Sequence, residues 1–177
     1  MDETLEDRLV ALAARDQQVL QELFDTGELP TDGYHPRLRA LHEDNARVLG
    51  AIIDRHGWPD RTMAGEKGAE AAWLVAQHAV FDLAFMQRCA DLVEKAVAAG
   101  TVPGWQLGFL QDRLRTLSGR PQLYGTQFER DAEGRLVPSP IEDPAGVDIR
   151  RAALGLNTLA ERTAEMQARD AAARRPR

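Results

Sequence analysis

The sequence has a single cysteine among its 177 residues, and this scarcity excludes two kinds of small protein. One thiol cannot form an internal disulfide, and it cannot supply the several cysteines of a cysteine-based zinc site. Cys89 lies between Phe85 and Leu92 in an apolar stretch, so we interpret it as a small core residue. The fold must therefore depend on an ordinary hydrophobic core.

An excess of positive charge is also missing. The 22 Lys and Arg residues are outnumbered by 28 Asp and Glu residues, which gives a formal net charge of -6. Such a chain has no basic face that could neutralise the phosphates of a duplex, so we expect no nucleic-acid partner. The one basic cluster is the end of the chain, "RDAAARRPR", which we predict to be a disordered basic tail over residues 169–177.

Long apolar runs are absent as well, because no window holds 18 uninterrupted apolar residues. The first residues, "MDETLEDRLVALAA", are acidic and lack the basic segment followed by an apolar segment that a secretion signal requires. We therefore expect no membrane partner and a soluble, cytoplasmic protein.

What the sequence does contain is helical periodicity, with apolar residues recurring every three or four positions. It predicts five helices, over about 4–24, 36–56, 68–99, 103–119 and 147–166. Extended runs on both sides of "DAEG" predict a small β-hairpin or ordered loop near 122–137. We predict a mainly α, single-domain helical bundle over residues 1–168, because a chain of this length can bury roughly two-thirds of its unfolded surface. The long Ala-rich third helix would fit a homodimer as readily as a monomer.

Short polar side chains interrupt the apolar stripes of three predicted helices. They are Asp16 on the first, Asn45 on the second, and His78 with Asp82 on the third. Burying such groups unpaired costs about 1–3 kcal/mol each, and more for a charge. We therefore expect these side chains to meet around one polar pocket or one hydrogen-bond network. His78 and Asp82, four residues apart, could also touch directly. Such a contact would be either a pair on the helix surface or one in which Asp82 fixes the tautomer of the imidazole and orients it as a base.

Six motifs, quoted in chain order, give the sequence a family resemblance: "HGWP", "AAWLVAQHA", "LQDRL", "QLYGTQF", "PIEDP" and "RRAALGL". The chain resembles, over about residues 5–166, a family of small bacterial proteins known as domain of unknown function 6624. The resemblance implies no reaction. It does imply which positions match the family motifs: Asp16, Gln17, Asn45, 57–59, Gln77, His78, Asp112, Arg113, Gln122, 124–127 and Arg151.

The chain departs from the family pattern at two positions. Val80 and His42 stand where the pattern has acidic residues, so a mechanism that needs those two carboxylates is in doubt for this chain. Asp82 could replace the first of them.

Two of the motifs offer ligand-binding groups, each with a structural alternative. In "LQDRL", Arg113 lies closer than Asp112 to the apolar face, so it could enter the pocket and bind a carboxylate or phosphate; the alternative is an ion pair in solvent. In "YGTQ", Gly125 permits a positive φ, while Tyr124 and Gln127 offer neutral groups that suit a small polar ligand. The alternative is that this loop simply packs over the end of the bundle.

These observations support two hypotheses about function. In the first, the protein is an enzyme or binding protein for a small polar molecule, with His78 as general acid or base oriented by Asp82 or Asp16. The substrate-binding residues would then be Asn45, Gln77, Arg113, Tyr124, Gln127 and Arg151. In the second, it is a non-catalytic protein–protein interaction module whose buried polar network only fixes the helix register.

Signatures of known catalytic sites do not decide between these hypotheses. The sequence has no phosphate-binding loop, no His-Glu-x-x-His and no nucleophile elbow, so whether it is an enzyme stays open and no cofactor is assigned. We assign no metal ligand either. A metal site is the alternative, because His78 with Asp16 and Asp82 offers nitrogen and oxygen donors, to which His56 or His42 could add another.

Overall fold

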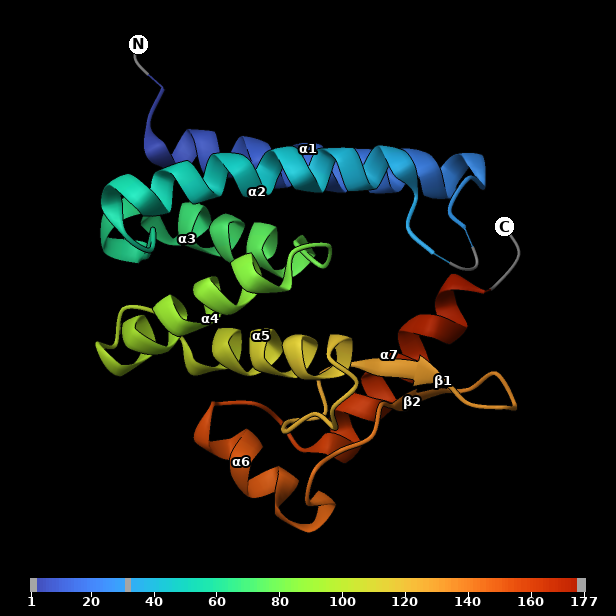
Figure 1. Cartoon of the computed structure of the whole chain (residues 1–177). Helices are drawn as coiled ribbons and strands as arrows, with labels where there is room; N and C mark the ends of the chain where they lie inside the picture. The colour runs from blue at the N-terminus through green and yellow to red at the C-terminus, as the bar shows by residue number, and fades with distance from the viewer. Residues whose placement is uncertain (1–2, 31–32, 175–177) are drawn as a thin grey trace. The chain divides into compact units, whose positions relative to one another are not determined.

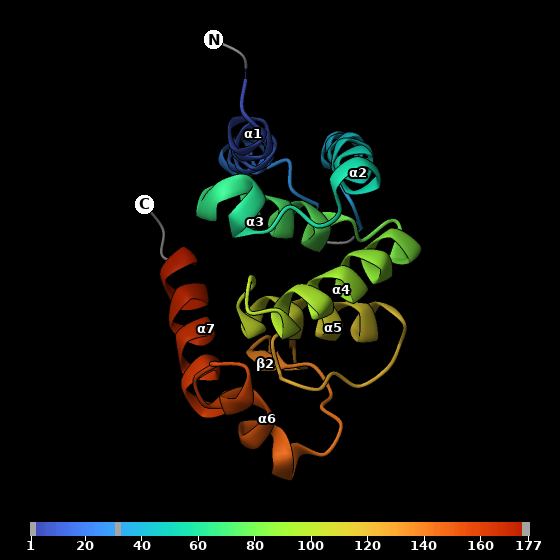
Figure 2. The same ribbon diagram turned by 90° about the vertical axis from the view of Figure 1, so that its left-hand side faces the viewer.

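The computed structural model describes residues 3–30 and 33–174, which form the mainly α-helical protein that the periodicity predicts (Figures 1 and 2). Over these residues it has seven α-helices and one two-stranded antiparallel sheet. Within the same ranges, no helix combines the length and the apolar character needed to cross a membrane.

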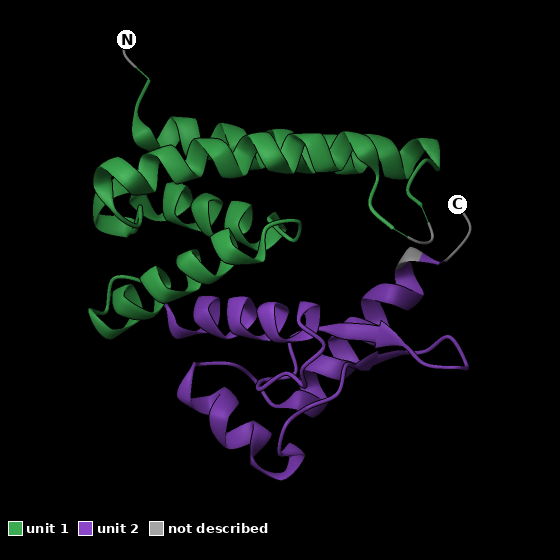
Figure 3. Ribbon diagram, in the orientation of Figure 1, with its two compact units in different colours: residues 1–102 green, residues 103–177 purple. Residues whose placement is uncertain are grey.

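The chain divides into two compact units, residues 1–102 and residues 103–177 (Figure 3). That residues 1–168 form a single domain stays a prediction.

Unit 1 consists of four helices, with α1 and α2 side by side and α3 crossing beneath them (Figures 1 and 2). Their bounds are α1 (Leu5–Thr26), α2 (Pro36–His56), α3 (Arg61–His78) and α4 (Leu83–Ala98). Local signals set the ends of the first two: α1 begins at a capping box of Thr4 and Asp7, and α2 begins at Pro36 and ends before Gly57. The first two predicted helices are therefore confirmed.

Packing against α1 fixes the positions of α2 and α3 in unit 1. Between α1 and α2 lies a cluster of buried side chains against which Tyr34, from the connecting loop, is packed: Val19, Leu23, Leu38 and Leu41. α3 approaches α1 closely at Gly68, where an added Cβ would lie 3.1 Å from the Cα of Glu6. Small side chains along α3 therefore allow its last turn to reach the middle of α1.

The predicted long third helix is wrong, because the chain leaves the helix after His78 and starts a new one at Leu83. Asp82 is the N-cap of α4, and its Oδ1 accepts a hydrogen bond of 2.9 Å from the backbone N–H of Phe85. A short acidic side chain at the N-cap stabilises the start of a helix, and this favours a new helix at Leu83 over an extension of α3. His78 and Asp82 are thus not one turn apart on one helix.

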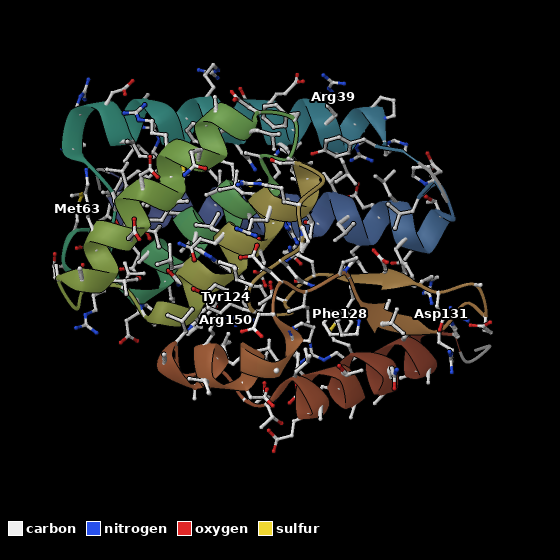
Figure 4. All side chains as sticks on the ribbon, turned by 60° about the horizontal axis from the view of Figure 1, so that its bottom comes forward. Arg39, Met63, Tyr124, Phe128, Asp131 and Arg150 are labelled. Carbon is white, nitrogen blue, oxygen red and sulfur yellow. The ribbon has the colours of Figure 1, made fainter. Side chains whose placement is uncertain are left out.

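Unit 2 contains the predicted hairpin together with three helices. Its elements are α5 (Gly104–Leu117), β1 (Phe128–Arg130), β2 (Leu136–Pro138), the 3-10 turn η1 (Pro144–Gly146), α6 (Val147–Ala153) and α7 (Leu159–Ala173). The strands are antiparallel, with Phe128 opposite Pro138, and Figure 4 shows Asp131 in the turn that joins them. The hairpin near 122–137 is confirmed.

The fifth predicted helix is also divided, into α6 and α7. Thr158 and Glu161 form a capping box that starts α7, a signal inside the predicted helix that the periodicity does not reveal. The predicted disordered tail begins too early, since residues 169–173 are the last residues of α7. Asp170 there is paired with Arg130 and Arg174, at 2.6 and 3.1 Å. Residues 175–177 of that tail lie outside the described residues.

Candidate functional site

Three helices of unit 1 each contribute one polar side chain to a common cluster. Nδ1 of His78, at the end of α3, lies 2.6 Å from Oδ2 of Asp16 on α1. Nε2 of His42, on α2, lies 3.1 Å from the same oxygen, and the centroids of the two imidazole rings are 4.9 Å apart. Asp16 is therefore the shared partner of two histidines.

The sequence places Asp16 and His42 inside because both lie on buried helix faces. Asp16 follows Leu9 by seven residues and precedes Val19 by three, which is the spacing of one helical face. Asp16 is 1% exposed and His42 is 8% exposed. The side chain of His78 is 22% exposed, so the cluster is closed at the carboxylate and opens toward solvent at His78.

Electrostatics keep Asp16 ionised. Burial by itself raises the pKa of this carboxyl group, but its interactions with His42 and His78 outweigh burial and hold the pKa well below its usual range. Its Oδ2 faces both imidazoles, whereas its Oδ1 is buried and has no hydrogen-bond partner among the described residues. Leaving a buried acceptor unpaired costs about 1–3 kcal/mol, which reduces what the cluster contributes to stability.

Tyr34 completes the cluster from the loop that precedes α2. Its hydroxyl group is hydrogen bonded to Nδ1 of His42 and lies 3.5 Å from the backbone carbonyl oxygen of His78. Burial raises the pKa of Tyr34 to about 12, and the negative charge of Asp16 adds to the effect. Tyr34 is therefore a neutral hydroxyl at physiological pH and holds His42 by the ring nitrogen that faces away from Asp16.

Two other predicted residues lie next to the cluster. Asn45 is buried on α2, and its Nδ2 donates a hydrogen bond of 3.4 Å to the carbonyl oxygen of Leu12, one turn before Asp16. Gln77 is buried on α3, directly before His78. Asn45 thus ties α2 to α1 at the level of the site.

The structure distinguishes between the two carboxylates that we predicted to orient His78. Asp16 reaches it, whereas Asp82 is exposed and its carboxylate caps α4. The predicted direct contact between His78 and Asp82 rested on a continuous helix and is wrong for that reason.

The predicted residues of unit 2 surround a different acid, Asp112 on α5. Its Oδ1 accepts from the backbone N–H groups of Leu123 and Tyr124 at 2.7 and 3.0 Å. Its Oδ2 accepts from the N–H and the hydroxyl group of Thr126, both at 3.0 Å. Asp112 is fully buried and Arg113 is partly buried, so both side chains turn inward, and Asp112 lies deeper than the spacing of apolar residues predicted. Asp112 is buried because backbone N–H groups of the loop donate hydrogen bonds to it, and the spacing of apolar residues on α5 does not reveal such contacts.

The other predicted groups of unit 2 also hold this loop. Nε of Arg113 donates to Oε1 of Gln127 at 3.1 Å, and NH1 of Arg151 donates to the carbonyl oxygen of Tyr124 at 2.5 Å. Gly125 has the predicted positive φ, 69°. Arg150 lies beside Tyr124 (Figure 4) and donates to the neighbouring carbonyl of residue 123. That Arg113, Tyr124, Gln127 and Arg151 bind a substrate stays a prediction.

Comparison with known proteins gives a family and no more. Residues 3–171 match the model of a family of unknown function, DUF6624. The chain belongs to this family. The resemblance drawn from the six motifs is thereby confirmed. No curated protein and no solved structure matches this DUF6624 member.

Sequence reasoning missed two members of the cluster in this DUF6624 protein as site residues. His42 carried one signal, since it is a polar residue on the buried face of α2, three positions before Asn45. The sequence indicated it only as a further metal ligand and as a departure from the family pattern. Tyr34 lies in a loop, where no periodicity could reveal its contact with His42.

A groove between α1 and α3 of this DUF6624 member offers a cavity of about 330 Å³. Its lining is mostly apolar: Val10, Ala13, Ala14, Gln17, Lys67, Glu70, Ala71, Trp73 and Leu74. It includes none of the three clustered residues. The groove is therefore separate from the polar cluster. The cluster, not the groove, has the carboxylate and imidazole groups that could exchange protons.

Proposed function

We propose that this protein binds a small polar molecule at the cluster of Asp16, His42 and His78, and exchanges a proton with it through His78. One observation carries the proposal: a buried carboxylate lies 2.6 Å from one ring nitrogen of a histidine that is itself partly exposed. Buried Asp16 serves to orient the ring, and His78 has the solvent access that a reacting group needs.

The proposed proton exchange follows from which ring nitrogen of His78 is hydrogen bonded to Asp16. Ionised Asp16 accepts the hydrogen on Nδ1 of His78, so Nε2 of the neutral ring carries the lone pair. Nε2 can take a proton from an O–H or N–H group of the bound molecule, and the resulting positive charge is stabilised by Asp16. The same proton is returned from Nε2 in a later step. A positioned general acid or base of this kind contributes roughly 10²–10⁴-fold to a rate.

The alternative hypothesis, a non-catalytic interaction module, attributes the cluster to helix register. A network with that role is expected to be fully hydrogen bonded. The oxygens of Asp112 in unit 2 meet this expectation, whereas Oδ1 of Asp16 and Oδ1 of Asn45 are buried without partners among the described residues. This contrast supports the small-molecule proposal for unit 1.

Variants of His78 test the proposal. The full-length wild type is compared with His78→Gln and with a matched control, His56→Gln, which changes an exposed histidine at the end of α2. Pools of hydroxy acids, amines and phosphate esters are screened for binding by ligand-observed NMR, and each bound compound is followed for conversion. We expect wild type and His56→Gln to bind and convert the same compound, and His78→Gln to lose conversion at least about 100-fold.

Two outcomes would contradict the proposal. One is a wild-type protein that binds no compound from these classes. The other is a His78→Gln variant that converts the compound as fast as the wild type. A strongly lowered melting temperature of His78→Gln, together with no bound compound in the wild type, would support the interaction module instead.

We also propose that the protein acts in the cytoplasm of a bacterium. Its one cysteine is free and buried, as suits a compartment in which disulfides do not form, and its motifs resemble those of small bacterial proteins. Fractionation of a source organism, with an antibody against the chain, would test the location.

A further inference from the structure

We propose that Asp16, His42 and His78 bind a divalent transition-metal cation. One potential ligand atom from each residue lies within 4.8 Å of the other two. The closest approaches assign Oδ2 of Asp16, Nε2 of His42 and Nδ1 of His78 as the ligands. The proposal concerns the same site as the proposed function but a different state of it. A metal on Nδ1 of His78 takes the place of the hydrogen that Asp16 accepts in the proton-exchanging state, so the two states exclude each other. The metal proposal rests on this geometry and not on proton transfer.

The types of donor atom indicate the class of metal. Two imidazole nitrogens with one carboxylate oxygen suit Zn²⁺, Fe²⁺, Co²⁺ or Mn²⁺, whereas Mg²⁺ and Ca²⁺ prefer oxygen ligands alone. Three protein ligands leave at least one coordination position open, as in catalytic metal sites. His78 is the most exposed of the three side chains, so solvent reaches the cluster on its side.

The cluster is close to the size that a metal requires. With metal–ligand distances of about 2.0–2.2 Å, two ligands of a tetrahedral ion lie roughly 3.4 Å apart. The distances from Oδ2 of Asp16 are 3.1 Å to Nε2 of His42 and 2.6 Å to Nδ1 of His78, so each nitrogen must move away from this oxygen by less than about 1 Å. His78 is suited to move, because it is the last residue of α3 and is followed by non-helical residues. The negative end of the α3 dipole also favours a cation there.

Unsatisfied buried atoms provide an independent observation. Oδ1 of Asp16 has no hydrogen-bond partner within the part of the chain that the structure describes. Nε2 of His42, although 3.1 Å from Asp16, makes no hydrogen bond of acceptable geometry within that part either. Asp16 and His42 are both more than nine-tenths buried. A cation between them would satisfy the nitrogen and neutralise the carboxylate without requiring a new fold.

Tyr34 prepares His42 for this role. Histidines that bind metals usually donate the hydrogen of their other ring nitrogen to an acceptor, which fixes the tautomer. The single hydroxyl hydrogen of Tyr34 can be donated to the carbonyl oxygen of His78, which leaves its oxygen free to accept from Nδ1 of His42. Nε2 of His42 then carries the lone pair and points toward Asp16.

Metal titration of the untagged, full-length chain tests the proposal. The protein is stripped with EDTA, dialysed and titrated with Zn²⁺ by calorimetry, and bound zinc is counted by mass spectrometry after gel filtration. We expect one Zn²⁺ per chain for the wild type and for the His56→Gln control. His42→Gln, His78→Gln and Asp16→Asn should each weaken binding at least about 100-fold, and Tyr34→Phe about 10–100-fold.

X-ray absorption of the zinc-loaded wild type provides a measurement that does not depend on the folding of any variant. We expect two imidazole ligands and at least one oxygen ligand. A spectrum without imidazole ligands would overturn the proposal, as would a folded His42→Gln variant that binds Zn²⁺ as tightly as the wild type.

The two proposals fail in different ways. If the wild type binds no Zn²⁺ but His78→Gln abolishes conversion of a polar compound, only the metal site is wrong. If Zn²⁺ binds with the expected pattern of variants but no polar compound binds, only the proposed function is wrong. Zinc-loaded and stripped proteins are therefore both carried through the compound screen.

Discussion

The substitution Asp112→Asn provides the sharpest test of the structure, because this buried acid accepts hydrogen bonds from four donor groups of one loop. An amide keeps one acceptor and replaces the other oxygen with a donor. In the better orientation the new NH₂ group replaces Oδ2, where the hydroxyl of Thr126 can turn to accept from it. The backbone N–H of Thr126 then loses its partner, and Leu123 and Tyr124 keep only an uncharged acceptor.

The size of the effect follows from these counts. A hydrogen bond to a charged group contributes about 1.5–3 kcal/mol, against about 0.5–1.5 kcal/mol for a neutral pair. Losing one charged bond and weakening two gives an expected loss of roughly 3–5 kcal/mol in the free energy of unfolding. Urea denaturation followed by far-UV circular dichroism measures this loss. Hydrogen exchange of residues 122–127 should become faster in parallel.

Asp148→Asn is the matched control, because Asp148 is exposed and accepts one hydrogen bond, from the backbone N–H of Leu159. Its loss of stability should stay below about 1 kcal/mol. If Asp112→Asn also costs less than about 1 kcal/mol, or if exchange in the loop is unchanged, then Asp112 does not organise this loop and our interpretation of unit 2 is wrong.

Three further predictions concern backbone conformation and burial. Gly125→Ala should lower stability by at least about 2 kcal/mol in thermal unfolding, because φ is 69° and the new Cβ would lie 2.5 Å from Cδ1 of Leu159; a neutral effect would refute the left-handed turn. Asp82→Ala should lower the free energy of unfolding by about 1 kcal/mol, because α4 loses its N-cap, and should leave Zn²⁺ affinity unchanged. A changed affinity would show that Asp82 takes part in the site of His78. Burial raises the pKa of Cys89 from 9.0 to about 12, so above pH 9 the thiol loses its proton on unfolding, and the free energy of unfolding should fall as the pH rises from about 9 to about 12. Urea titrations at pH 8 and pH 10 should show this fall for the wild type and not for Cys89→Ala. The same pH dependence in both proteins would count against the burial of Cys89.

Sequence reasoning worked well wherever a signal was local. The ends of α1 and α2 follow from caps and prolines within a few residues of each boundary, and the periodicity between them is unbroken. It failed at two helix breaks, after His78 and before Thr158, where apolar periodicity continued across a new start. A cap contributes about 1 kcal/mol, which is enough to stop a helix but does not alter the spacing of apolar residues.

The candidate site shows the same limit. Asp16 and His78 were predicted to share a polar interior because each interrupts an apolar stripe, and the structure brings them within 2.6 Å. Asn45 also lies inward, but its amide bonds to a carbonyl of α1. Periodicity assigns a residue to a face within about one position, whereas a hydrogen bond depends on separations of a few tenths of an ångström. Contacts between particular side chains therefore lay beyond the sequence.

By itself, the sequence determined that the protein is helical, that it belongs with the chains that carry its six motifs, and that Asp16 and Asn45 lie on buried helix faces. Only the tertiary structure decided that Asp16 rather than Asp82 serves His78, that His42 and Tyr34 join them, and that Asp112 rather than Arg113 organises the loop of unit 2. The physical reason is that periodicity and capping act within one helix. The rotation and crossing of neighbouring helices, which bring these atoms within hydrogen-bonding distance, arise from the packing of segments that are far apart in the chain.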